Sequence, residues 1–124
     1  MSVSYPRVLV ANAPTGAQLD LPVIDAGFGR DALVVFQIVG NDSWNGSVRT
    51  LMRINGADRS TVANVPFLQC AHTDELTKQE KNNTTDITTA GIYSVHAHGA
   101  EVMLRILNTG STGTVTILAH SVDG

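Results

Sequence analysis

The stretch from residue 91 to residue 122 constrains the fold more than any other part of the chain. It contains three runs in which apolar and polar residues alternate, and turns rich in glycine separate them. Because successive side chains of a β-strand point to opposite faces, such runs are typical of strands with one face buried. We therefore predict an all-β, single-domain antiparallel β-sandwich over residues 1–124, jelly-roll-like, with about eight or nine short strands.

Three earlier segments refine this prediction. Residues 32–39 form the most apolar run, and their β-branched content favours a central strand buried on both faces. Residues 17–25 alternate but contain Pro22, which cannot donate to a ladder, so this run should lie at a sheet edge or beside a bulge. The pair Asn55 and Gly56 is the preferred sequence for a type I′ hairpin turn.

Composition points to a surface that is partly covered. Hydrophobic residues make up 43% of the chain and charged residues only 15%, well below the usual quarter. A chain so poor in charge is expected to bury some of its surface in an assembly. The net charge is −3 and the basic residues are scattered, so no basic stripe is present to displace counterions from phosphates. We expect no binding to nucleic acid.

The single cysteine, Cys70, excludes an internal disulfide framework. No apolar run approaches the roughly 20 residues that span a bilayer, so no membrane partner is expected. Residues 1–7 lack the charged and apolar regions of a signal peptide. We therefore expect synthesis in a cytoplasm.

Two pairs of residues raise the question of a metal site. His96 and His98 are two positions apart, as are Cys70 and His72, so on strands each pair would share a face. The alternative is that the histidines are solvent-facing polar residues of a half-exposed strand. The sequence holds no CxxC or HExxH motif, and nothing places the two strands side by side, so we favour this alternative and predict no metal.

No pattern of residues indicates an enzyme or a bound cofactor. The glycine-rich segments 27–30 and 110–113 lack the phosphate-loop sequence, and no GxSxG motif presents a nucleophile. The carboxylates of Asp74 and Glu75 lie in a charged polar stretch where water should solvate them. We therefore expect a binding or structural role rather than catalysis.

Two segments are candidates for contact with a partner. Residues 72–89 are predicted to form a long polar loop, and residues 1–7 a short N-terminal arm, and each could order on a partner at some entropic cost. Leu76 would be the apolar anchor within the loop. The alternating residues Val102, Leu104 and Ile106 could instead form a subunit interface, although a place in the core is favoured. The candidate partner-binding residues are Ser2, Val3, Ser4, Tyr5, Arg7, Trp44, Asp74, Glu75, Leu76 and Lys78.

Trp44, the only tryptophan, lies in a polar turn between Ser43 and Asn45. An aromatic ring at such a position can stack on a sugar or anchor a protein partner, because it buries a large area with few rotatable bonds. Alternatively, the ring closes one end of the sandwich core, which is the interpretation we favour.

Five short motifs, taken in chain order, carry a family resemblance. They are Ser-Trp-Asn-Gly-Ser-Val at 43–48, Ile-Asn-Gly-Ala-Asp-Arg-Ser at 54–60, Gly-Ile-Tyr-Ser-Val at 91–95, Gly-Ala-Glu-Val-Met-Leu-Arg at 99–105 and Thr-Gly-Thr-Val-Thr-Ile at 112–117. In this order they resemble the small β-sandwich module of tailed-bacteriophage virion proteins. The resemblance covers residues 41–121.

A chain that consists of one such module resembles the head-decoration, or cement, proteins of phage capsids. This resemblance implies a homo-oligomer, a homotrimer in the first place and a homodimer as the alternative. It would bind the outer surface of the major capsid protein lattice and stabilise the head against the pressure of packaged DNA. Two other roles stay open: a carbohydrate- or receptor-binding module of a tail fibre that uses Trp44, and another structural component of the tail or neck.

Overall fold

The structure is a computed structural model that describes residues 2–3, 6–26 and 29–123. These residues form twelve β-strands and one turn of 3-10 helix, η1 (Ala57–Arg59), and none of their helices is long and apolar enough to cross a membrane. The strands are β1 (Ser2–Val3), β2 (Arg7–Pro14), β3 (Leu19–Asp20), β4 (Ile24–Asp25), β5 (Leu33–Asn41), β6 (Val48–Ile54), β7 (Leu68–Gln69), β8 (His72–Asp74), β9 (Gln79–Lys81), β10 (Gly91–His96), β11 (Ala100–Ile106) and β12 (Thr114–Asp123).

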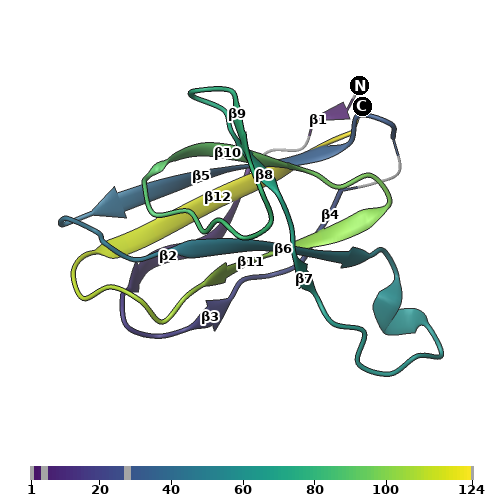
Figure 1. Cartoon of the computed structure of the whole chain (residues 1–124), viewed down its shortest axis with the longest axis horizontal. Helices are drawn as coiled ribbons and strands as arrows, with labels where there is room; N and C mark the ends of the chain where they lie inside the picture. Colours follow the sequence, from purple (N-terminus) through teal and green to yellow (C-terminus); the bar gives the residue numbers. More distant parts are fainter. Residues whose placement is uncertain (1, 4–5, 27–28, 124) are drawn as a thin grey trace.

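The strands form two antiparallel sheets that pack as a sandwich (Figure 1). The seven-stranded sheet has the order β1-β12-β5-β10-β8-β9, and β2 also pairs with β12. The five-stranded sheet has the order β3-β11-β6-β7, and β4 also pairs with β11. The chain crosses repeatedly between the layers, since β10 and β12 belong to one sheet and β11 to the other. The predicted all-β sandwich is therefore confirmed.

The strands outnumber the eight or nine that the sequence predicts, because two segments break into short pieces. Pro22 interrupts the edge segment and leaves β3 and β4, both of which pair with β11. The polar segment 72–89 is not a loop throughout, because β8 and β9 form a short hairpin within it. Its first strand extends the seven-stranded sheet, with Asp74 opposite Tyr93 of β10.

The prediction of a hairpin turn at Asn55 and Gly56 is wrong. Gly56 adopts a φ of 80° and leads into η1 instead of a returning strand. The next strand to pair with β6 is β7, which begins only at Leu68. We call residues 55–67, between β6 and β7, the excursion. The guanidinium of Arg53 lies 4.3 Å above the Phe67 ring, so tertiary contacts fix its path.

The core lies between the sheets and uses alternate residues of the long strands. Val34, Phe36 and Ile38 of β5 are at most 1% exposed. They face the apolar residues of β11, Val102, Leu104 and Ile106, which are at most 2% exposed and therefore belong to the core. Full burial of each aliphatic side chain stabilises the fold by about 1.5–3 kcal/mol.

Only one face of β5 is fully buried, contrary to the prediction of burial on both. On the outward face Leu33, Val35 and Val39 stay partly exposed and Gln37 is exposed. The apolar run reflects alternating strand geometry, in which every second residue points away from the core. Within one chain no third layer of described residues covers this outward face.

Two glycines provide a matched test of how tightly the end of the sandwich is built. Gly113 has a φ of +80°, and a Cβ there would meet the Asn41 carbonyl oxygen and lie 2.5 Å from the Trp44 backbone nitrogen. Gly16 has a φ of +94° but no atom within 4 Å of such a Cβ.

We predict that Gly113→Ala lowers the free energy of unfolding by more than about 2 kcal/mol, because it adds a clash to the backbone strain of about 1–2 kcal/mol. Gly16→Ala should cost only that strain. Urea denaturation of both variants measures the difference, and equal losses would contradict the close packing of Gly113 against Trp44.

Candidate partner-binding surface

The β8–β9 hairpin lies at the edge of the seven-stranded sheet (Figure 1). Its tip holds the exposed apolar side chain of Leu76 on a turn that several hydrogen bonds fix. The backbone N–H of Leu76 donates to Oδ1 of Asp74 over 3.0 Å, and the N–H of Glu75 donates to the Ile92 carbonyl over 2.9 Å. Lys78 closes the turn with a φ of 61°. Leu76 itself is 68% exposed. The structure therefore brings together the predicted residues Asp74, Glu75, Leu76 and Lys78.

Glu75 fastens this turn to the sheet. Its Oε1 accepts a hydrogen bond of 2.7 Å from Lys78 Nζ, and its Oε2 accepts one of 2.6 Å from the hydroxyl of Ser94, which is buried. Both bonds favour the carboxylate form, first the one from Lys78, and they lower the pKa of Glu75. The exposed ion pair adds little stability. The bond to Ser94 ties the tip to β10.

The N-terminal residues belong to the sheet rather than to a free arm. Ser2 and Val3 form β1, which pairs with the last residues of β12. Arg7 begins β2, pairs with the same strand further back, and is exposed. Ser4 and Tyr5 lie outside the described residues. Binding of a partner by this segment stays a prediction, but for the described residues it would start from a paired backbone.

Trp44 is packed against the core at one end of the sandwich. A Cβ on Gly46 would lie 2.8 Å from the indole Nε1, and one on Gly40 would lie 3.1 Å from the Trp44 Cβ. The indole N–H is buried and has no hydrogen-bond partner. The residue is partly exposed, and its packed ring closes one end of the core.

Of the four residues considered for a metal, Cys70, His72 and His96 are among those that line one cavity, and His98 is not. Among the described residues no group of three or more His, Cys, Asp or Glu side chains is placed to hold an ion. The His98 ring lies 2.8 Å from the Gly29 carbonyl oxygen, and His96 is exposed. Cys70 is buried, and burial raises the pKa of its thiol, which stays protonated.

His72 occupies an unusual position between the sheets. It is 3% exposed, and its Nδ1 has no hydrogen-bond partner. Its ring meets Tyr93 edge-on, with 5.8 Å between ring centroids, and Tyr93 in turn stacks on Phe36. Burial lowers the pKa of His72, and the nearby Lys81 lowers it further, against the opposing effect of Asp74. The ring is therefore neutral at pH 7.

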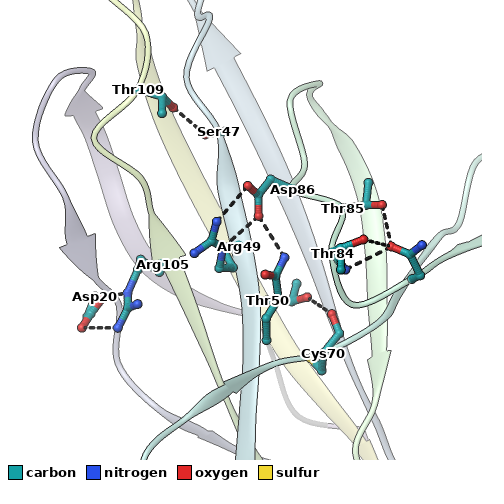
Figure 2. Close-up of polar contacts among 12 residues, drawn as sticks. Asp20, Ser47, Arg49, Thr50, Cys70, Thr84, Thr85, Asp86, Arg105 and Thr109 are labelled. Atoms are coloured by element: carbon teal, nitrogen blue, oxygen red, sulfur yellow. Dashed lines mark hydrogen bonds and ion pairs between the residues drawn. The ribbon is translucent and has the colours of Figure 1, made fainter.

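The outer face of the five-stranded sheet carries ion pairs that sequence reasoning missed (Figure 2). Arg105 donates to Asp20 over 2.6 Å, and Arg49 donates to Asp86 over 2.9 Å. The two arginines are direct cross-strand neighbours. Gln69 also donates to Oδ1 of Asp86 over 3.0 Å. These contacts attach the residues before β10 to the sheet.

On the same face Arg53 of β6 lies opposite Glu101 of β11 and donates to it over 2.5 Å. Both side chains are less than one-fifth exposed. The signal in the sequence was the spacing of Arg49 and Arg53 within one strand, which places both on one face. The acidic partners come from other strands and from a loop, so the pairing itself needed the fold. Each cation on this face is therefore largely neutralised within the chain.

A comparison with known protein families finds no family model that matches this chain, and no curated protein matches it either. Among solved structures, the crystal structure of the SPBc2 prophage-derived protein YomS is similar, with a TM-score of 0.64. The sequences are 11% identical, and the match covers 98% of this chain and 97% of that chain. The two proteins therefore share a fold along nearly their whole length.

The buried His72 predicts a loss of stability in acid. Its pKa is lower in the folded state than in the unfolded chain, so below about pH 6.5 the unfolded state binds a proton that the folded state does not. Stability is fully present above that pH. It should fall by at most about 1.4 kcal/mol for each pH unit below it.

His72→Phe keeps the ring contact with Tyr93 and removes the titrating group. Denaturation of both proteins between pH 7.5 and 5.0 gives the change in the free energy of unfolding with pH for each. Subtracting one change from the other removes the contribution of the other histidines, which both proteins share. A variant that loses as much stability in acid as the unchanged protein would rule out this role for His72.

Proposed function

We propose that this chain is a structural protein of a phage particle that decorates the outside of the capsid and stabilises the head. The observation that carries the proposal is the shared fold, over 98% of the chain, with a protein derived from a prophage. The order of the five motifs described above supports the same family of virion modules. The role is binding rather than catalysis, and the chain would be made in the host cytoplasm before assembly.

The partner is the lattice of the major capsid protein, and the hairpin tip is the contact. Leu76 is exposed on a turn that Asp74 and Glu75 already hold in place. A preformed turn loses little conformational entropy on binding, so more of the contact energy remains as affinity. An apolar anchor that fills a pocket is the kind of residue that dominates an interface.

Decoration also fits the way in which charge is distributed. The arginines Arg49, Arg53 and Arg105 are each paired with a carboxylate of the same chain. With Lys78, four of the eight Lys and Arg residues are in ion pairs within the described part of the chain. Binding would depend on shape and apolar contact rather than on attraction to nucleic acid. Many copies, each adding contact area between capsid subunits, would resist the outward pressure of packaged DNA.

The ring of Trp44 packs against the core, which accounts for its position without the sugar-binding alternative. A structural role in the tail or neck uses the same fold and differs in location and copy number.

The test uses heads of the encoding phage that lack this protein. We predict that the purified chain co-sediments with them in hundreds of copies per head and raises their melting temperature. Leu76→Asp should weaken binding at least tenfold, because it places a charge in an apolar contact.

The matched control is Val62→Asp, since Val62 is 64% exposed on the excursion before β7, away from the hairpin. It should bind as the unchanged protein does. Absence of binding to heads, or binding of only a few copies, would overturn the proposal.

A further inference from the structure

The segment that carries the β8–β9 hairpin is attached to the five-stranded sheet at both of its ends. At its start the N–H of Cys70 donates to the Thr50 carbonyl over 2.9 Å, and the Thr50 hydroxyl donates to the Cys70 carbonyl over 2.9 Å. At its end Val48 and Ile87 exchange backbone hydrogen bonds of 2.9 and 2.8 Å. Cys70 and Ile87 are both buried. Residues 71–85 lie between these two anchors, and we call them the flap.

The flap is joined to the seven-stranded sheet by only a short ladder. Among the described strands β9 pairs with β8 alone, and β8 pairs with β10 at two positions, Thr73 with Ser94 and Asp74 with Tyr93. The structure describes every residue of the flap, and His72 alone among them is buried. Its ring, edge-on to Tyr93, is therefore the side chain that fastens the flap to the core.

His72 fits this position only as a neutral ring. An imidazolium has two N–H donors, and the Nδ1 of His72 is buried without a hydrogen-bond partner. A proton on Nδ1 would add a charged, unsatisfied donor between the sheets, which is costly. The ring also lines two surface cavities, of about 520 and 250 Å³, so a short displacement brings it into water.

The charged groups around the ring do not offset this cost. Burial has the largest effect and lowers the pKa of His72, and Lys81 of β9 lowers it further. Asp74 of β8 and Asp86, which precedes β10, oppose this shift without cancelling it. Asp86 is already paired with Arg49. The other titratable residues that contact the ring or line the two cavities are Cys70, Glu80, Tyr93 and His96.

The second fastening of the flap withstands mild acid. Glu75 accepts hydrogen bonds from Lys78 and Ser94, which lower its pKa, so its carboxylate stays ionised down to pH 5. His96 lowers the same pKa, because its positive form attracts this carboxylate. Between pH 7.5 and 5.0, protonation of His72 is thus the change that opposes the closed flap.

We propose that residues 71–85 form an acid-sensitive flap, which opens when His72 takes up a proton and leaves the rest of the sandwich folded. The charged ring moves into water, and the two pairs between β8 and β10 separate. The anchors at Cys70 and Ile87 hold, because neither gains charge in this range. Leu76 lies at the tip, so acid also weakens binding to heads, a consequence that rests on the capsid contact proposed above.

Hydrogen exchange of the backbone amides, corrected for the intrinsic effect of pH, tests the opening on the purified chain. Between pH 7.5 and 5.0 the protection of the β8 and β9 amides should fall by up to about 30-fold, the limit set by one proton. The amides of β5 and β12 should stay protected throughout, since their nine-pair ladder lies outside the flap.

Three variants separate His72 from the other histidines. His72→Phe does not titrate, so protection of the flap should no longer depend on pH. His72→Gln is a second non-titrating variant of different shape and should behave in the same way. His98→Asn removes a histidine whose ring lies beside Gly29, outside the flap, and should leave the response intact.

Protection of the flap that does not change with pH, or that falls equally in the non-titrating variants, would overturn the proposal. An equal loss in β5 and β12 would do the same, because the whole fold would then be opening.

Heads loaded at pH 7.5 and moved to pH 5.0 should lose the unchanged protein and keep His72→Phe. A chain that opens in the exchange experiment but stays on the heads in acid would overturn the link to binding. A chain that never binds heads would contradict the capsid role, and the exchange result would then decide the flap by itself.

Discussion

The ladder between β5 and β12 is the constraint on which most of the structure depends. It pairs nine residues of each strand, and β2 and β10 add to its two sides. Strict alternation along it sends Phe36 and Ile38 into the core and, by the same geometry, Val35 and Gln37 outward. A shift of one residue would exchange the two faces, so core burial fixes the register. The partly exposed aliphatic residues on the outward side of β5 are thus a direct consequence of the register that builds the core.

The two sheets differ in how they satisfy their outer faces. The outer face of the five-stranded sheet carries ion pairs, which join β3, β6 and β11 and the loop that holds Asp86. The buried pair Leu51 and Met103 lies between them. The outward face of the seven-stranded sheet mixes partly exposed aliphatic residues such as Val35 with the polar residues Gln37 and His120. Surface ion pairs contribute modestly to stability.

The sequence predicted what depends on local alternation and on proline. The sandwich, the edge position of the run with Pro22 and the core role of Leu104 all follow from strand geometry. Prediction from the sequence failed where contacts between residues far apart in the chain determine the local structure. Asn55 and Gly56 suit a tight turn, yet Arg53 and Phe67 hold a longer excursion there. Residues 72–89 were predicted to be a loop, but β8 and β9 form a hairpin there because β8 pairs with the edge of β10. The ion pairs join residues up to 85 positions apart, so no local pattern could show them.

Electron cryomicroscopy of phage heads assembled with and without this protein tests the central claim most directly. The account predicts difference density for the β-sandwich on the outer surface of the shell, repeated over the whole lattice, with the hairpin tip turned toward the capsid protein. Density confined to the tail or neck, or no difference between the two kinds of head, would contradict it.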